Sequence, residues 1–163
     1  MSGGCCAPSK PSADKVLCPV TNMAGRPVRD VTLRALVKPS ILASIQTAGL
    51  FFFCDAPHCD VVYFNAEGAL IRKSDMRVAV HQKDGSLNTP VCYCFGYTPD
   101  KIRGEIRQTG RSAAVADISR KVQEGLCDCE TTNPQGTCCL GNIGKVVKSA
   151  LAKFRETSKE ETL

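Results

Sequence analysis

The cysteines of this chain restrict its fold more than any other feature. Eleven of the 163 residues are cysteines, and six of these form three close pairs between residues 92 and 139. An odd number of cysteines fits poorly with a closed set of disulfide bonds. In a reducing compartment, grouped thiols bind metal more often than they form disulfides. The pairs are Cys92 with Cys94, Cys127 with Cys129, and Cys138 with Cys139.

The rest of the sequence favours a cytoplasmic protein without membrane insertion. Residues 1–11 are mostly small and polar and show no signal peptide. The longest apolar run, residues 48–54, is far shorter than the ~20 residues that span a bilayer. The net charge of +5 is an argument for nucleic-acid binding. Thiolate-bound metal centres would offset much of that charge, and the basic residues are scattered among acidic ones, so we expect no nucleic-acid partner.

The first half of the chain is rich in β-branched and aromatic residues in alternating patterns, which are typical of strands. Pro39 stands at a plausible first position of a short helix. The predicted elements are strands over 28–37, 51–53, 61–64 and 78–80, a hairpin turn over 65–68 and a helix over 39–45.

The composition changes near residue 89, and helical patterns follow. Thr98 and Pro99 form a helix start, and Gly110 and Gly125 follow predicted helix ends. A third helix begins near Leu140, and its charged end is expected to fray. The predicted organisation is a flexible arm over 1–17, a β-rich module over 18–88, a helical module over 89–155 and a charged tail over 156–163.

The turn Cys92-Tyr93-Cys94 lies shortly before the helix start at Thr98. An iron–sulfur cluster needs four soft, anionic ligands, and the N–H groups of a helix start favour negative charge. The second pair of ligands must then come from residues 127–139. The sequence thus predicts a [2Fe–2S] cluster, with a four-cysteine zinc site and buried core thiols as alternatives. Zinc prefers C-x2-C turns. Neither the turn Cys92-Tyr93-Cys94 nor the cysteines of residues 127–139 form such a turn.

The stretch from Cys92-Tyr93-Cys94 to Cys139-Leu140-Gly141 resembles the [2Fe–2S] domain of the bacterioferritin-associated ferredoxin (BFD) family. The resemblance implies a C-x-C turn, a helix–turn–helix, and two more cysteines at the head of a helix. Cys127 and Cys138 remain alternatives for the second pair, although the helix-head position favours Cys139. The predicted cluster ligands are Cys92, Cys94, Cys129 and Cys139.

A longer stretch, which includes Asn133-Pro134-Gln135-Gly136, is similar to the N-terminal part of CopZ-type copper chaperones. The resemblance runs from about Cys18 to Phe154. In that family a zinc-binding module precedes the [2Fe–2S] module. It implies an α+β fold, in which a small β-rich zinc-binding module is followed by a helical, BFD-like [2Fe–2S] module.

Three cysteines of the first module lie in predicted turns beside strands, which suits a structural zinc site. CopZ-type modules commonly have C-x2-C in the first turn, whereas here Thr21 stands in place of its second cysteine. Threonine is a poor zinc ligand, so we predict that Cys6 of the flexible arm supplies the fourth. Cys5 and His58 are alternatives, as is a β-module without metal. The predicted zinc ligands are Cys6, Cys18, Cys54 and Cys59.

No residues of the sequence form a catalytic constellation, so we do not expect an enzyme. The resemblance implies metal handling with a [2Fe–2S] cluster, Zn²⁺ and Cu(I). CopZ-type chaperones carry a separate copper-transfer domain with a C-x2-C loop, and this chain contains no C-x2-C. We therefore expect an accessory or chaperone-like protein whose partners are a copper-transfer domain, a copper-exporting ATPase or a redox protein. The alternatives are a ferredoxin-like one-electron carrier for a redox or metal-storage protein, and a redox sensor.

Overall fold

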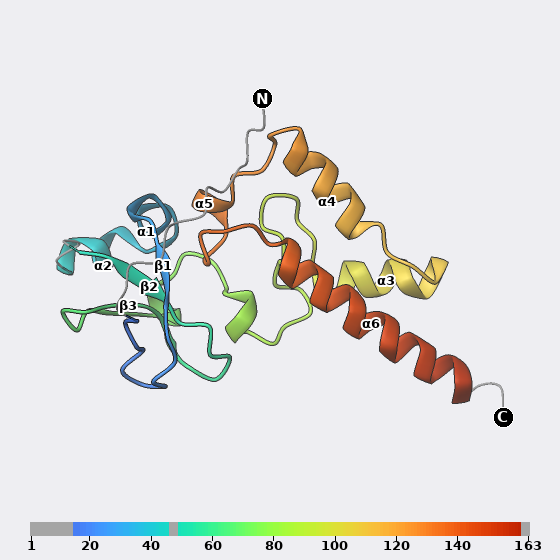
Figure 1. Ribbon diagram of the computed structural model, residues 1–163, viewed down its shortest axis with the longest axis horizontal. Helices are drawn as coiled ribbons and strands as arrows, with labels where there is room; N and C mark the ends of the chain where they lie inside the picture. Colours follow the sequence, from blue (N-terminus) through green and yellow to red (C-terminus); the bar gives the residue numbers. More distant parts are fainter. Residues whose placement is uncertain (1–14, 46–48, 161–163) are drawn as a thin grey trace. The chain divides into compact units, whose positions relative to one another are not determined.

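The structure, a computed structural model, describes residues 15–45 and 49–160 and belongs to the α+β class. Its sheet has four antiparallel strands in the order β1-β2-β3-β4 (Figure 1). None of the described helices is long and apolar enough to cross a membrane. The strands are β1 (Arg26–Val28), β2 (Phe51–Phe53), β3 (Val61–Asn65) and β4 (Leu70–Arg72). The helices are α1 (Asp30–Leu36), α2 (Pro39–Ser44), α3 (Pro99–Thr109), α4 (Ala114–Gln123), α5 (Cys129–Thr132) and α6 (Leu140–Glu160).

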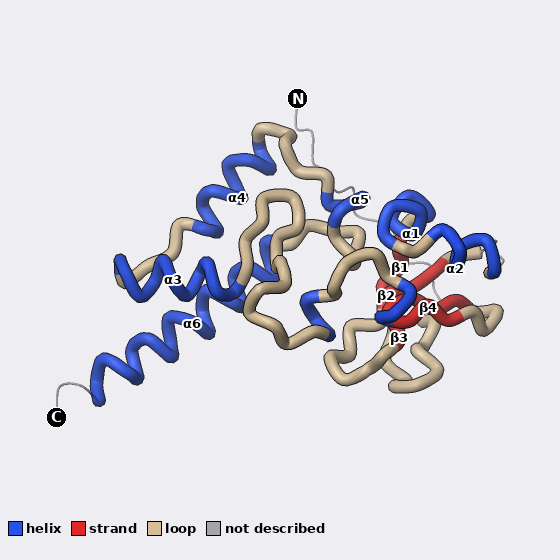
Figure 2. The backbone as a smooth tube through the Cα atoms, turned by 180° about the vertical axis from the view of Figure 1, so that it is seen from behind, coloured by secondary structure: helices blue, strands red, loops and turns tan. Residues whose placement is uncertain are grey.

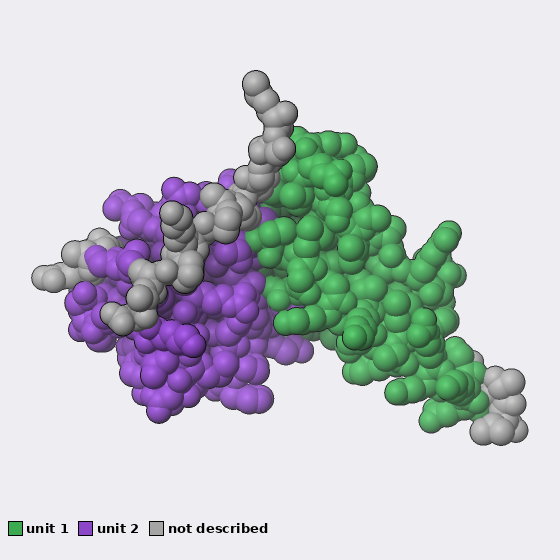
Figure 3. Space-filling view, in the orientation of Figure 1, with its two compact units in different colours: residues 1–5, 86–127, 138–163 green, residues 6–85, 128–137 purple. Residues whose placement is uncertain are grey.

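The chain divides into two compact units, which Figure 3 shows in different colours. The sheet unit contains the described residues up to Gly85 and, in addition, residues 128–137. The helical unit contains residues 86–127 and the described residues from Cys138 onward. The chain therefore leaves the helical unit after Cys127 and returns to it at Cys138. Sequence analysis did not anticipate that residues 128–137 belong with the sheet.

The sheet buries side chains on both of its faces. Phe51 and Phe53 of β2 pack with residues of α1 and α2, which lie on one face of the sheet (Figures 1 and 2). Phe52 points to the other face, where its ring stacks on Phe64 with 6.0 Å between the centroids. This alternation is what a strand imposes on successive side chains. The second face carries Cys18, Cys54 and Cys59, so these thiols belong to a hydrophobic core.

The predicted strand over 28–37 is wrong, because most of it is α1. Only Val28 of that range lies in a strand, β1. The acidic residue Asp30 lies in the first turn of α1 and pairs with Arg34 one turn later, which supports a helix. Leu33 and Leu36 face the core at a spacing of three residues, a spacing that fits a helix but not one face of a strand.

One further prediction needs correction. Residues 78–80 form no strand, and Val80 instead precedes a 3-10 helix, η2 (His81–Lys83). The last helix, α6, extends through charged residues to Glu160. The predicted strands at 51–53 and 61–64, the hairpin that follows, and the helix starting at Pro39 are confirmed.

In the helical unit, α6 packs against both α3 and α4. The predicted start of α3 is confirmed, because the Thr98 hydroxyl accepts a hydrogen bond from the Lys101 N–H at 3.1 Å. Gly110 ends this helix in the left-handed conformation, with φ of 74°. The shared core includes Ile102 and Ile106 of α3, Ile118 of α4 and Ile143 of α6.

Asp117 of α4 accepts hydrogen bonds from the Lys121 ammonium and the Tyr97 hydroxyl, each at 2.7 Å. These groups, Lys121 first, lower the pKa of Asp117 to about 2. Because the folded pKa is the lower one, the carboxylate stabilises the fold above its ordinary pKa of ~3.9, and this contribution is lost as the pH falls toward 2.

We predict that Asp117→Asn lowers the free energy of unfolding at pH 7, and that the difference from the parent protein falls to roughly half near pH 3. Urea unfolding of both proteins at the two pH values measures this difference. If the two proteins differed in stability by the same amount at pH 7 and at pH 3, the assignment of the lowered pKa to Asp117 would be contradicted.

Residues 128–137 are tied to the sheet unit by hydrogen bonds and an ion pair. The buried Tyr63 hydroxyl of β3 donates to the Pro134 carbonyl at 2.6 Å. The Arg29 guanidinium, just before α1, pairs with Glu130 of α5 at 2.7 Å. Gly136 lies against α1, where a β-carbon at this position would be 3.0 Å from the Thr32 hydroxyl oxygen. This segment therefore has a defined seat on the sheet unit.

We predict that Gly136→Ala destabilises the protein more than Gly125→Ala. Both glycines have a positive φ, 65° and 73°, so both substitutions impose a strain of about 1–2 kcal/mol. Only Gly136 meets a neighbour, whereas nothing lies within 4 Å of a β-carbon at Gly125. We expect the excess loss at Gly136 to be about 1 kcal/mol, measured by urea unfolding. Equal losses would show that residue 136 is not seated tightly.

Candidate metal centres

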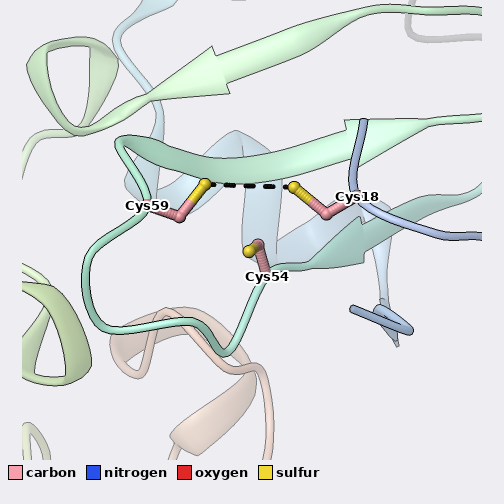
Figure 4. A group of neighbouring side chains, drawn as sticks. All are labelled: Cys18, Cys54 and Cys59. Atoms are coloured by element: carbon pink, nitrogen blue, oxygen red, sulfur yellow. Dashed lines mark hydrogen bonds between the residues drawn. The ribbon is translucent and has the colours of Figure 1, made fainter. Parts of the chain in front are cut away.

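Three cysteines of the sheet unit direct their thiols toward one point (Figure 4). The sulfur atoms of Cys18, Cys54 and Cys59 all lie within 4.8 Å of one another. The Cys18 and Cys59 sulfurs are 3.9 Å apart. Each of the three residues is at most 2% exposed. The structure thus brings together three of the four predicted zinc ligands, and Cys6 lies outside the described residues.

The positions of these thiols follow from the local structure. Cys54 directly follows β2, and its N–H donates to the Val62 carbonyl at 2.9 Å, so it continues the pairing of β2 with β3. Cys59 lies two residues before β3. Cys18 begins a tight turn in which the Asn22 N–H donates to the Cys18 carbonyl at 2.8 Å. Asn22 adopts a positive φ of 57°, which asparagine tolerates better than most residues.

The spacing of the thiols fits a zinc ion. Zinc bound by thiolates is tetrahedral with Zn–S distances of ~2.3 Å, which places neighbouring sulfurs ~3.8 Å apart. The distance of 3.9 Å between the Cys18 and Cys59 sulfurs agrees with that geometry. Thiolates are also the soft, anionic donors that zinc accepts. The three residues could therefore hold Zn²⁺ after only small side-chain movements.

The surroundings of Cys18 favour its thiolate form. Burial raises the pKa of this thiol, but hydrogen bonds from the Thr21 side chain and from the backbone at Val20 and Thr21 outweigh the effect and lower the pKa to about 7. For Cys59, burial raises the pKa, and the neighbouring Cys54 adds to the shift. Three thiols at this spacing thus disfavour a second and third negative charge unless a cation binds among them.

Sequence analysis missed one residue of this site, Lys83. Lys83 is only 7% exposed. Its ammonium donates to the carbonyls of Ala56 and Cys59, at 2.8 and 3.2 Å. It thus holds the loop that joins Cys54 to Cys59. A buried lysine with two backbone acceptors has no local sequence signal, because its partners lie more than twenty residues away.

We predict that Lys83→Met lowers the free energy of unfolding by about 2 kcal/mol, since it removes charge-assisted hydrogen bonds to buried carbonyls. We also expect faster loss of zinc to a chelator, because the Cys54–Cys59 loop is freed. Lys73→Met, at an exposed position of the same unit, is the matched control and should change stability by less than about 0.5 kcal/mol. Urea unfolding and zinc release measure the two effects, and similar behaviour of both variants would refute the role of Lys83.

The fourth corner of the site is next to Thr21. Its hydroxyl oxygen lies 3.8 Å from the Cys54 sulfur, so the turn places this side chain where a second cysteine of a C-x2-C turn would stand. His58, an alternative ligand, is exposed and is not part of the thiol group among the described residues. Cys5, the other alternative, lies outside the described residues.

In the helical unit, Cys92 and Cys139 are buried members of one hydrophobic cluster, and the partly buried Cys94 packs against it. The turn that carries Cys92 and Cys94 is closed by a hydrogen bond of 2.8 Å from the Val91 N–H to the Tyr97 carbonyl. Cys139 directly precedes α6, and its carbonyl accepts from the Ile143 N–H at 2.9 Å. Three of the four predicted cluster ligands thus share the core of this unit.

The remaining cysteines of the predicted cluster region are placed differently. Cys129 is a buried, reduced residue at the start of α5, in the segment that belongs to the sheet unit. Cys127 is only partly buried and lies at the end of the stretch that belongs to the helical unit. Cys138 is partly exposed, and the described members of the hydrophobic cluster do not include it.

Known proteins are similar to this chain in sequence and in fold. Residues 15–77 match a family described as "Zinc binding domain", of the CopZ type. The chain is 33% identical over 129 residues to the copper chaperone CopZ of Archaeoglobus fulgidus, an alignment that covers 79% of this chain and 60% of that protein. Its fold is similar to the X-ray structure of the Archaeoglobus fulgidus CopZ N-terminal domain, with a TM-score of 0.67 and 30% identity over 80% of this chain and 97% of that one.

Proposed function

This chain belongs to the family of the CopZ N-terminal domain, and from that premise we propose that it is a cytoplasmic metal-handling protein rather than an enzyme. It binds one zinc ion in the sheet unit and one [2Fe–2S] cluster, and it acts as an accessory or chaperone-like protein in copper handling. The observation that carries the proposal is the meeting of three buried thiols, Cys18, Cys54 and Cys59, within 4.8 Å.

The zinc ion has a structural role in this proposal. The strands of the sheet unit are only three to five residues long, so a metal bond between them adds stability that such a small core lacks. Cys54 and Cys59 flank the loop between β2 and β3, and Cys18 lies before β1. A zinc ion bound to all three ties together strands that are distant in sequence.

The [2Fe–2S] cluster is supported by one hydrophobic cluster of the helical unit, which contains Cys92 and Cys139 and against which Cys94 packs. The first N–H groups of α6, which follow Cys139, favour the negative charge of bound thiolates. Cys129 is the proposed fourth ligand, because it is buried whereas Cys127 is only partly buried. These ligands form the BFD-like part of the proposal. The cluster, when bound, supplies reversible one-electron chemistry.

Copper enters the proposal as a cargo. The chain covers 60% of the copper chaperone to which it is related, so that protein's activity and partners are proposals for this chain. Cu(I) favours soft thiolates, and the cysteines outside both proposed centres offer such ligands. The proposed partners are a copper-transfer domain and a copper-exporting ATPase, together with a redox protein that exchanges electrons with the cluster.

Anaerobic purification of the full chain followed by metal and sulfide analysis tests the proposal. We expect about one zinc, two iron and two sulfide per chain. Zinc below about a tenth of this amount would dismiss the zinc site, and iron without sulfide would dismiss the cluster. Cu(I) binding is measured by competition with a chelator on the metal-loaded protein. Binding that occurs only after loss of the cluster would sink the role in copper handling.

We predict that Cys92→Ser abolishes most of the visible absorbance and iron content, because it removes a buried cluster ligand. Cys138→Ser is the matched control and should leave both unchanged. Cys129→Ser should behave like the Cys92 variant, and Cys127→Ser like the control. Unchanged iron in the Cys92 variant would exclude this residue as a ligand, whereas iron loss in the Cys138 variant would exchange the roles of the adjacent cysteines.

A one-electron carrier is the second candidate function, favoured by the partly exposed Cys94 at the edge of the buried thiols. A ligand that reaches the surface offers a route for electrons to a partner protein. This candidate requires a reversible one-electron reduction with a rhombic EPR signal. If the reduced protein shows that signal and no Cu(I) binds, electron transfer replaces copper handling as the function.

A further inference from the structure

We infer that the fourth coordination position of the zinc site, beside Thr21, binds an exchangeable ligand. In the resting site this ligand is a water oxygen, and a soft thiolate from outside the site replaces it. The inference rests on the zinc site proposed above, and it takes the place of the prediction that Cys6 completes the site. In the exchange, an incoming thiol loses its proton to solvent, its sulfur bonds to zinc and the water leaves.

The geometry of the first turn carries this inference. Cys18 and Thr21 have the spacing of a C-x2-C zinc turn, and the positive φ of Asn22 closes that turn. The Thr21 hydroxyl lies 3.8 Å from the Cys54 sulfur, close to the ~3.8 Å edge of a tetrahedral zinc site. The side chain thus stands beside the fourth corner. A neutral alcohol binds zinc much more weakly than a thiolate does, so this corner is left for another donor.

The same corner is the one that faces solvent. The three cysteines are at most 2% exposed, whereas Thr21 is only partly buried. Three large apolar side chains around this turn are unusually exposed: Leu17 by 48%, Val20 by 61% and Met23 by 46%. A zinc position that is open toward an exposed apolar surface is typical of sites that exchange a ligand, whereas closed structural sites bury four protein ligands.

Charge favours the same conclusion. Zinc with three thiolates carries one net negative charge, and with four it carries two. Among the described residues, the buried thiols accept hydrogen bonds from neutral donors such as the Thr21 hydroxyl, the backbone around Cys18 and the backbone at Val61, while Lys83 is directed at carbonyls rather than sulfur. A site with one negative charge is easier to bury than one with two. The class of ligand expected is a thiolate, whose charge is added only when it binds at the exposed corner.

Zinc K-edge X-ray absorption of the full, metal-loaded chain tests the inference, because iron does not contribute to that edge. We expect three sulfur neighbours at ~2.3 Å and one oxygen or nitrogen neighbour at ~2.0 Å in buffer free of thiols. Addition of 2-mercaptoethanol, the probe thiol, should raise the sulfur count to four. A resting site that already has four sulfur neighbours overturns the inference but keeps the zinc proposal, and the absence of zinc overturns both.

Thr21→Cys should give four sulfur neighbours without added thiol and about tenfold or tighter zinc binding in chelator competition. Thr21→Val keeps the shape of the side chain and is the matched control, with three sulfur neighbours as in the parent protein. If Thr21→Cys fails to fold, the thiol titration of the unaltered chain still decides. Loss of a sulfur neighbour in Cys6→Ser or Cys5→Ser would assign the corner to an arm thiol and refute the inference.

Discussion

Mutual repulsion among three buried thiolates is the constraint on which the sheet unit depends. Cys18, Cys54 and Cys59 lie within 4.8 Å in the hydrophobic core on one face of the sheet, where ionised thiolates are unfavourable without a cation. A zinc ion converts this repulsion into bonds between the ends of short strands. The opposite face of the sheet needs no such help, because helices α1 and α2 cover it with aliphatic side chains.

The two proposed centres solve the same problem with different local structure. In the sheet unit, the thiols follow or precede strands, and strand pairing fixes their distance. In the helical unit, Cys92 and Cys94 share one turn while Cys139 stands at the start of a helix, whose N–H groups offset negative charge. Helix packing rather than strand pairing then brings the thiols into one core. Each unit thus uses the backbone groups that its own fold supplies.

Local patterns predicted much of this structure, and the failures have two causes. Residue spacing and turn chemistry predicted the aromatic strands and the start of α3. They also predicted that Cys18, Cys54 and Cys59 would lie together. The error at α1 arose because alternating apolar residues fit both periods when a helix has only seven residues. Lys83 and the placement of residues 128–137 could not be predicted, since both depend on hydrogen bonds between distant residues such as Tyr63 and Pro134.

The seat of residues 128–137 on the sheet unit has a consequence for how such a protein can evolve. Modules that occupy one continuous stretch of a gene are easily duplicated, lost or fused to new partners. Here the sheet unit is built from two separate stretches, and a cut near residue 86 would strip it of Tyr63's acceptor and of the partner of Arg29. A gene that ended near residue 86 would therefore encode a sheet unit without the segment that completes it.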